Sequence, residues 1–462
     1  MKKDNLTINF IYSITANLIS LLSNALLVFL LPKFLTEEGY GYYNLYLFYI
    51  SYVGIFHFGL ADGAYLRYGG IYYENLDRNL IKGQIIFLVV IETFISLCIV
   101  IGGIIKYNDS DRMYIIIIAA LNCLIYLPRI FLQYVLQASG KIILYAKNYI
   151  FERVSFFLIV IISFIFHKYN YKYIIFSDIF VKFLTGVLFI HSCKDIFISQ
   201  LPSFHKILKE VIANCKVGCI LLFANISSIL IIGCIRFLIE KKWNIAVFGK
   251  ISLALTICNV FVSFINAISL VLFPYLKRLT DVDLMNNFNK LSLRVTLFMF
   301  CCMPFFFPLR IFVEKFLPSY NESIIALSLL FPIALFETRM ALILLTYMKI
   351  YRQEKAILFI NLITVVCSFI YSILSYIFSF KMILNLLAIV ILIILRAFMF
   401  DIYVKRKLLK ISNCDFLFNI GYAACFILLR NQKCIISIIS LIFLCILFYL
   451  LHFIKLKNHT NR

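Results

Sequence analysis

Apolar segments of membrane-spanning length recur along this chain from residue 8 to residue 454, and no other feature constrains its fold more. A helix needs about 20 mostly apolar residues to cross a bilayer. Segments near that length, bounded by charge, Gly or Pro, lie at 8–31, 42–62, 83–105, 113–136, 149–167, 173–192, 213–238, 246–273, 291–313, 323–348, 356–378, 382–404, 415–430 and 434–454. The short segment 415–430 ends at Arg430, so twelve or thirteen spans stay as alternatives. We predict an all-α integral membrane protein with about fourteen transmembrane helices.

The composition excludes a soluble domain of ordinary kind. Hydrophobic residues make up 63% of the chain and charged residues 14%, whereas soluble domains are about 45–50% apolar. The 44 basic residues outnumber the 22 acidic ones, but they fall in short gaps between apolar segments, which indicates the anionic membrane surface and not nucleic acid. No phosphate-binding Gly-x-x-x-x-Gly-Lys motif is present, and cysteines lie mostly in apolar runs without metal-ligand spacing. We expect no catalytic site, no metal and no bound cofactor.

The basic residues also predict an orientation. Short cytoplasmic loops carry an excess of Lys and Arg, and one set of loops and ends is clearly richer, with Lys2, Lys3, Arg67, Arg78, Lys82, Lys141, Lys147, Lys206, Lys209, Lys277, Lys349 and the run Lys405-Arg406-Lys407. The opposite set pairs its bases with acids such as Glu37, Glu38, Asp109 and Asp111. We therefore expect both termini to face the cytoplasm.

A basic stretch at 193–212 divides the predicted helices into two groups of six. A faint internal repeat supports this division, because Phe34-Leu35-Thr36-Glu37 after the first segment resembles Phe237-Leu238-Ile239-Glu240 after the seventh. Many transporters are built from such repeats around a central site. We predict an N-terminal lobe at 1–192, a cytoplasmic linker at 193–212, a C-terminal lobe at 213–404, and two further helices with a tail at 405–462.

Polar residues at helical spacing mark two candidate cavity-lining faces. The segment 8–31 carries Ser13, Asn17, Ser20 and Asn24, and the segment 246–273 carries Ser252, Thr256, Asn259, Ser263 and Asn266. Since lipid is the costliest environment for these groups, each stripe is expected to face protein or water. Helix packing through small polar residues is the alternative. Arg236 and Lys250 are near enough to contribute to the same cavity.

Charged residues within the spans are stronger signals, since each costs roughly 2.5–3.5 kcal/mol at the bilayer centre. They are Glu92, Arg129, Glu152, Arg153, Asp178, Lys182, Glu337, Arg339 and Arg396. Asp178 and Lys182 are spaced to neutralise each other on one helix, while Glu152, Arg153, Glu337 and Arg339 require partners on other helices. We expect Arg339 and Arg396 to line the cavity, and Glu92 and Glu337 to serve in gating or ion coupling.

The turn that follows the second segment is a candidate gate. Asp62 and Arg67 flank it, and Gly63, Gly69 and Gly70 lie within or next to it. Glycine permits backbone conformations that other residues avoid, and the two charges can pair or engage a partner across a cavity mouth. A plain solvated turn is the alternative.

Three local motifs carry a resemblance to a known family. The stretch from Leu31-Pro32-Lys33-Phe34-Leu35-Thr36 to Gly41-Tyr42-Tyr43 resembles the family's turn after its first helix. The stretch Phe58-Gly59-Leu60-Ala61-Asp62-Gly63 is similar to the element that closes its second helix, and Val271-Leu272-Phe273-Pro274-Tyr275 looks like its end of helix eight. The chain thus resembles the polysaccharide transporter, or Wzx-type flippase, branch of the multidrug/oligosaccharidyl-lipid/polysaccharide (MOP) exporter superfamily. The resemblance covers residues 1 to about 404.

This resemblance implies a fold like that of the multidrug exporters called MATE, with two six-helix lobes around a central cavity. It also implies a flippase of the bacterial inner membrane that moves an undecaprenyl-pyrophosphate-linked oligosaccharide, for O-antigen (lipopolysaccharide), capsule or exopolysaccharide, to the outer leaflet. A proton or sodium gradient would drive alternating access, and polysaccharide polymerase and chain-length regulator proteins would be possible partners. A MATE-like multidrug or cation antiporter is the alternative, although it would be expected to place acids, not Arg and Lys, in its cavity. A scaffold or polymerase is disfavoured because the loops are short.

Overall fold

Helices form all the secondary structure in the computed structural model, which describes residues 3–460 except 277–278, 410–414, 431 and 433. Among the described residues, ten helices are long and apolar enough to cross a membrane, and two bent pairs raise the number to as many as twelve. Two shorter apolar helices follow, at Phe416–Leu429 and Ile435–Tyr449. Every predicted apolar segment coincides with one of these elements. The prediction of an all-helical membrane fold is confirmed.

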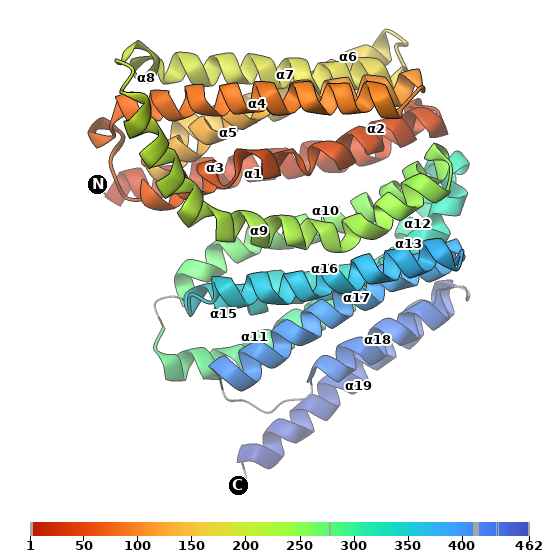
Figure 1. Ribbon diagram of the computed structural model, residues 1–462. Helices are drawn as coiled ribbons and strands as arrows, with labels where there is room; N and C mark the ends of the chain where they lie inside the picture. Colours follow the sequence, from red (N-terminus) through yellow and green to blue (C-terminus); the bar gives the residue numbers. More distant parts are fainter. Residues whose placement is uncertain (1–2, 277–278, 410–414, 431, 433, 461–462) are drawn as a thin grey trace. The chain divides into compact units, whose positions relative to one another are not determined.

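The chain folds into two compact units, and the N-terminal unit contains Met1–Ile229 and Ile245–Gly249. Its helices, drawn from red to green in Figure 1, are α1 (Lys3–Phe34), α2 (Glu37–Ile50), α3 (Leu60–Arg67), α4 (Arg78–Lys106), α5 (Ser110–Ala138), α6 (Ile142–Ile165), α7 (Tyr171–Ser192), α8 (Lys194–Ile198) and most of α9 (Phe204–Lys242).

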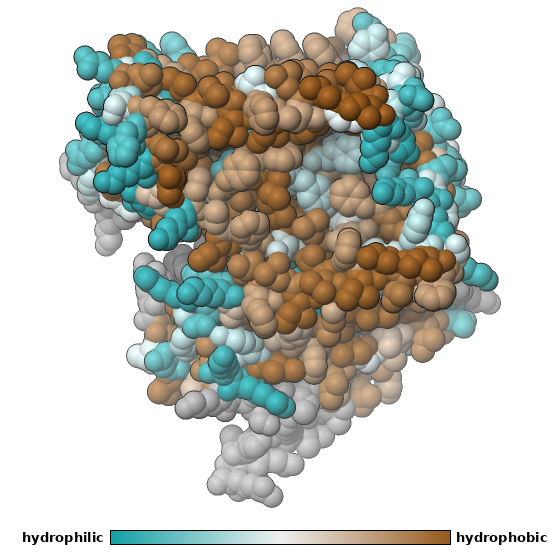
Figure 2. Space-filling view, in the orientation of Figure 1, coloured by the Kyte–Doolittle hydropathy of each residue, from teal (hydrophilic) through white to brown (hydrophobic). Residues whose placement is uncertain are grey.

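Helix α5 is the centre of the N-terminal unit, since it packs against α2, α3, α4, α6 and α7. Its side chains Cys123, Leu127, Phe131 and Val135, which follow one another at steps of four, are fully buried. In contrast, α4 exposes large apolar side chains along its length, such as Val90, Phe94 and Ile105. Figure 2 shows hydrophobic residues over the middle of this unit and hydrophilic residues at its two ends, as a bilayer-embedded bundle requires.

The C-terminal unit contains Leu230–Asn244 and Lys250–Arg462. Its helices are the end of α9, α10 (Ile245–Leu276) from Lys250 on, α11 (Asp281–Cys302), α12 (Phe306–Phe316), α13 (Asn321–Leu330), α14 (Ile333–Arg339), α15 (Leu345–Ile350), α16 (Glu354–Ile377), α17 (Met382–Ile402), α18 (Asp415–Leu429) and α19 (Cys434–Thr460). Helix α17 packs against α13, α14 and α16, while α18 and α19 pack together and α19 touches α11. The many fully buried side chains of α17 reflect this central place.

Two predicted segments are broken in the structure. The segment 42–62 becomes α2 and the 3-10 helix Val53–His57, followed after a 60° bend by α3. Phe58 and Gly59 make this bend with positive φ angles of 50° and 81°, a backbone region that continuous helices do not use. The segment 323–348 bends by 45° ahead of Ile333, where Pro332 lacks the N–H that a continuous helix would bond. Hydropathy shows how long an apolar segment is but not whether the chain bends within it, so each segment was predicted as a single helix.

Helix α9 begins inside the stretch predicted as a linker. Residues 193–212 contain α8 and the first turns of α9, which continues without interruption to Lys242. The stretch is therefore largely helical. The division into lobes at 192, 212 and 404 stays a prediction.

Candidate functional site

Five ionisable side chains gather inside the N-terminal unit, at the level where α5, α6 and α7 pack together. We call Arg129, Glu152, Arg153, Asp178 and Lys182 the N-unit cluster. Arg129, Glu152 and Lys182 are each less than 9% exposed. Three of its members are basic and two are acidic. The sequence marked all five as charges within spans, but its site prediction included none of them.

Asp178 and Lys182 form one half of the cluster. They are one helical turn apart on α7 and their charged groups are 2.6 Å apart, as their spacing predicted. Asp178 also accepts a hydrogen bond of 2.6 Å from the Tyr46 hydroxyl of α2, and Tyr46 in turn accepts one of 3.0 Å from the Asn122 amide of α5. The pair is thus part of a network that connects three helices, which fixes its position.

Arg129, Glu152 and Arg153 form the other half. Arg129 on α5 pairs with Glu152 on α6, the interhelical pairing that the sequence required of Glu152. Arg153 stacks over the Tyr149 ring at 5.1 Å, and the Tyr149 hydroxyl lies 3.0 Å from the Ser20 hydroxyl of α1. Among the described residues no carboxylate lies within 4 Å of Arg153, and its buried Nε–H has no acceptor. Arg153 therefore forms no direct ion pair among the described residues, although the Asp178 carboxylate of the same cluster attracts it from a longer distance.

The polar stripe of α1 only partly faces its neighbours. Ser20 is buried against α6, Asn17 is half-buried and Asn24 is exposed. The exposed leucines Leu18, Leu22 and Leu26 occupy the other side of this helix. Helix α1 therefore has two uncovered faces in its own unit, one apolar and one polar. The side chain of Ser13 lies outside the described residues.

The stripe of α10 has a similar character. Ser252 is buried, Thr256 bonds the Ser252 carbonyl at 2.7 Å, and Asn259 is exposed. The side chain of Asn266 lies outside the described residues. Arg236 on α9 donates to the Ser252 hydroxyl at 2.9 Å, and Lys250 pairs with Glu322 at 3.0 Å. The structure therefore brings Arg236 to the base of this stripe and gives Lys250 an acidic partner, while their place in a cavity stays a prediction.

Arg339 and Arg396 lie in two buried ion pairs of the C-terminal unit. Arg339 bonds Asp401 at 2.8 Å, and Asp401 also bonds Lys405 at 2.8 Å. Arg396 bonds Asn361 at 3.0 Å and Glu337 at 3.3 Å. Both arginines are at most 3% exposed. Each thus has an acidic partner within the C-terminal unit, in contrast to Arg153, and their role in a cavity stays a prediction.

Arg67 belongs to a network that joins α3, α4 and α9. Its guanidinium donates to Glu210 at 2.8 Å and to Asn214 at 2.6 Å. Tyr68 donates to Glu210 at 3.0 Å and accepts from Gln84 at 2.8 Å. Burial raises the pKa of Tyr68 to about 12, so its hydroxyl stays protonated and available to donate. Arg67 therefore has its acidic partner, Glu210, on α9, within the stretch that the sequence predicted as a linker.

Asp62 and Glu92 are the other two predicted gating or coupling residues of this unit. Asp62 is buried, and its carboxylate lies 3.8 Å from the His57 ring on the other side of the helix break. Glu92 on α4 is fully buried, and neither carboxyl oxygen has a hydrogen-bond partner among the described residues. The two acids thus occupy quite different surroundings.

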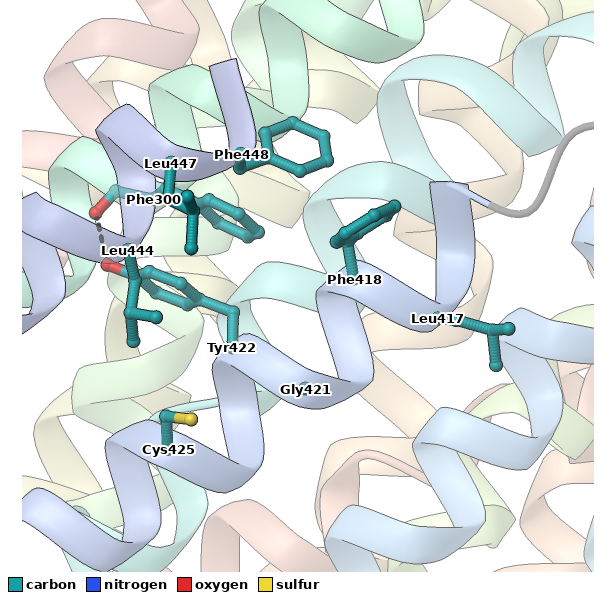
Figure 3. Close-up of a pocket in the computed structure, with 9 residues that line it drawn as sticks. All are labelled: Phe300, Leu417, Phe418, Gly421, Tyr422, Cys425, Leu444, Leu447 and Phe448. Atoms are coloured by element: carbon teal, nitrogen blue, oxygen red, sulfur yellow. Dashed lines mark hydrogen bonds between the residues drawn. The ribbon is translucent and has the colours of Figure 1, made fainter. Parts of the chain in front are cut away.

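An apolar pocket of about 500 Å³ lies in the C-terminal unit between α11, α18 and α19 (Figure 3). Phe300, Phe418, Tyr422 and Phe448 form most of its wall. The Tyr422 hydroxyl donates its proton to the Phe300 carbonyl at 2.7 Å, so it can offer a ligand only an acceptor. With its other walls apolar, this pocket suits hydrocarbon better than a charged or glycosidic group. It could not be foreseen from the sequence, because it depends on how two short helices pack on a third.

Comparison with solved structures shows which fold this is. The lipid II flippase MurJ in an inward closed conformation matches with a TM-score of 0.66 at 14% identity, covering 98% of this chain and 100% of that one. An inward-facing MATE family multidrug resistance transporter of the MOP superfamily matches with a TM-score of 0.61 at 12% identity, covering 90% and 100%. A MATE protein in complex with MaD5 matches at 0.52 with 11% identity, covering 91% and 95%.

No protein-family model and no curated protein matches this sequence. The likeness is therefore one of architecture, and it extends over nearly the whole chain. The protein has the fold of MurJ and of the MATE transporters, and this confirms the MATE-like arrangement of helices expected from the sequence.

Proposed function

We propose that this protein is a flippase that moves an undecaprenyl-pyrophosphate-linked oligosaccharide from the inner to the outer leaflet of the bacterial cytoplasmic membrane. The observation that carries the proposal is Arg153, a cation for which the described residues supply no carboxylate partner, beside tyrosines in a membrane-embedded unit. The similarity to the fold of a lipid II flippase supports it. The glycan is an O-antigen, capsule or exopolysaccharide repeat unit.

The chemistry of such a substrate matches the N-unit cluster. A pyrophosphate is a dense anion, and Arg binds phosphate oxygens through two parallel hydrogen bonds. A cation inside a membrane without a directly paired anion is costly, so the half-buried Arg153 gains when a substrate anion pairs with it. Tyr149 and Ser20 lie beside it with hydroxyls that suit sugar groups. The lipid tail needs no polar path.

Alternating access in this proposal is driven by a proton or sodium gradient. Glu92 and Glu337 are the proposed coupling acids, and Asp62 and Arg67 form the proposed gate. The ion pair of Arg67 with Glu210 connects α3 to α9. If one of these helices moves relative to the other, this ion pair has to break, whereas a joint movement preserves it. A polysaccharide polymerase and a chain-length regulator are the proposed protein partners.

The test is a flipping assay with the purified full chain in liposomes. Vesicles contain an undecaprenyl-pyrophosphate-linked oligosaccharide, and an impermeant glycosidase outside reports how much glycan reaches the outer leaflet. Arg153→Gln is expected to lower the rate roughly tenfold or more, since a lost charge-assisted hydrogen bond costs about 1.5–3 kcal/mol. Arg153→Lys keeps the charge and is expected to retain more activity. Arg78→Gln, at a solvated ion pair with Asp195, serves as the control.

A multidrug or cation antiporter is the second candidate, because Glu92 is an acid inside the membrane without a partner among the described residues, and MATE transporters share the fold. Cells that produce the chain are expected to accumulate ethidium like cells without it. Efflux of ethidium that Glu92→Gln abolishes, together with no glycan movement in liposomes, would replace the flippase proposal by this one.

A further inference from the structure

A second pocket, of about 420 Å³, opens at one end of the N-terminal unit. The turns α1–α2, α4–α5 and α6–α7 meet there, on the right of this unit in Figure 1. Glu38 and Tyr42 come from α2, Asp111 from the start of α5, and Tyr169, Asn170 and Tyr171 from the turn into α7. We call it the turn pocket. It differs from the N-unit cluster in charge, since no basic residue is among the described residues that line it.

Aromatic rings make the walls of the turn pocket. Tyr42 and Tyr171 stack with centroids 5.2 Å apart and an interplanar angle of 26°. The Tyr169 ring stacks on Phe34 at 5.6 Å and 16°, yet Tyr169 is 38% exposed. Phe164 and His167 also lie near this ring, with centroids at 6.1 and 5.7 Å, and the part of Tyr169 that stays exposed lines the pocket. A flat aromatic platform of this kind stacks against the C–H face of a pyranose ring.

Oxygen acceptors and an amide donor stand around this platform. The Asp111 carboxylate is held by Lys172 at 2.6 Å, and the Asn170 side-chain oxygen accepts the Lys172 N–H at 2.9 Å. Within the described chain, the Asn170 amide NH₂ group and the Glu38 carboxylate have no hydrogen-bond or ion-pair partner. Both side chains are exposed. They are therefore available to a ligand that both donates and accepts hydrogen bonds.

The charge of the pocket selects the ligand. Lys172 neutralises the charge of Asp111 but adds no net positive charge, and Glu38 stays negative. The pocket is therefore negative overall and would repel a phosphate group. Sugar hydroxyls donate to carboxylates and accept from amides, and neither interaction needs a net positive site. Aromatic stacking with a carboxylate and an amide is the combination by which proteins recognise uncharged carbohydrate.

We propose that the turn pocket binds an uncharged sugar residue of a glycan, stacked on Tyr169 and hydrogen-bonded to Glu38 and Asn170. The chemical class of ligand follows from the pocket alone. Its place in a transport cycle rests on the proposed flippase function and on the predicted orientation, in which these three turns face the periplasm and would hold the glycan after it has crossed.

Binding is measured on the purified full chain in nanodiscs by saturation-transfer NMR, with a panel of uncharged disaccharides of N-acetylglucosamine, galactose and mannose. At least one is expected to bind saturably. Tyr169→Ala is expected to weaken binding by about tenfold, as loss of a stacking ring predicts. Glu38→Gln changes a solvent-exposed group without disturbing packing and is also expected to weaken it. Tyr72→Ala, at the opposite end of this unit and 53% exposed, is expected to have no effect.

Absence of saturable binding by every disaccharide would overturn the proposal, as would equal binding by Tyr169→Ala, Glu38→Gln and the unchanged chain. Competition by inorganic pyrophosphate would show an anion site and would overturn it too. The flipping assay separates this result from the proposed function. Flipping without sugar binding would overturn only the proposal for the turn pocket. Sugar binding without flipping would overturn only the flippase proposal.

Discussion

Two ionisable side chains, Arg153 and Glu92, lie inside apolar helices without a direct ion pair in the part of the chain that the structure describes. Their surroundings differ. Arg153 is only half-buried and lies against a tyrosine ring, so an anion can reach it. Glu92 is fully enclosed, and an unpartnered buried carboxyl is tolerated in its neutral form far better than as an ion. We therefore propose two roles, anion binding for Arg153 and proton transfer for Glu92.

Replacing Glu92 by Gln tests the second role. An amide has nearly the shape of a neutral carboxyl group, so Glu92→Gln is expected to leave the thermal unfolding temperature of the purified protein within about 2 °C of the original, as for a substitution that adds no charge or cavity. Transport in liposomes is expected to lose its response to an imposed proton gradient. A variant that still responds fully to the gradient would exclude Glu92 from coupling.

The sequence identified individual charges but not their partners. Asp178 and Lys182 could be paired in advance because their spacing on one helix is enough. The partners Glu152 for Arg129, Asp401 for Arg339 and Glu210 for Arg67 lie on other helices. Which helices are neighbours depends on packing over the whole unit, and hydropathy carries no information about it. For this reason the N-unit cluster was missed as a site.

Among the secondary-structure elements, α3 and α9 cross at close range in the N-terminal unit because glycines lie at the crossing. A Cβ added to Gly63 would overlap the backbone oxygen of Asn214, and one added to Gly218 would overlap that of Gly59. Backbone atoms cannot move aside as a flexible side chain can. The sequence singled out Gly63 as a turn residue, whereas the structure shows that it permits close helix packing, much as small residues do in other membrane bundles.

Substitution of these glycines is expected to separate α3 from α9. Gly63→Ala and Gly218→Ala should each destabilise the protein by about 1–3 kcal/mol or more, the usual range for overpacking. Gly186→Ala on α7 is the matched control, since a Cβ there meets nothing within 4 Å, and alanine is the better helix former. Thermal unfolding in detergent measures all three. Equal unfolding temperatures for Gly63→Ala and Gly186→Ala would contradict the close crossing.

Helix α1 carries a second test at this scale. Asn24 and Leu22 are both exposed, but two residues along a helix are about 200° apart, so they face opposite directions. If the polar face meets water and the leucine face meets lipid, Asn24→Cys reacts with a small hydrophilic maleimide and Leu22→Cys does not. Both substitutions are made in a chain whose native cysteines have been replaced. Equal reaction at both positions would show that the polar stripe does not line an aqueous path.

For the whole molecule, the number and order of the apolar helices could be predicted because the bilayer imposes one length on every span. The breaks at Phe58–Gly59 and ahead of Ile333 could not, since a bent span has the same hydropathy as a straight one. Orientation was predicted from loop charge. It stays a prediction, and the positions of the turn pocket and of the Arg67 network on the two sides of the membrane depend on it.

Labelling of single cysteines from outside intact cells decides this orientation. Glu38 and Asn170 mark the end of the N-terminal unit that holds the turn pocket, and Glu74 and Asn79 mark a second polar pocket formed by other turns of this unit. All four are exposed. With the fourteen native cysteines replaced, cysteines at 38 and 170 are expected to react with a membrane-impermeant maleimide, because the loops with fewer bases face the periplasm. Cysteines at 74 and 79 should react only after permeabilisation. The reverse pattern would place both termini in the periplasm and move the proposed sugar site to the cytoplasmic side.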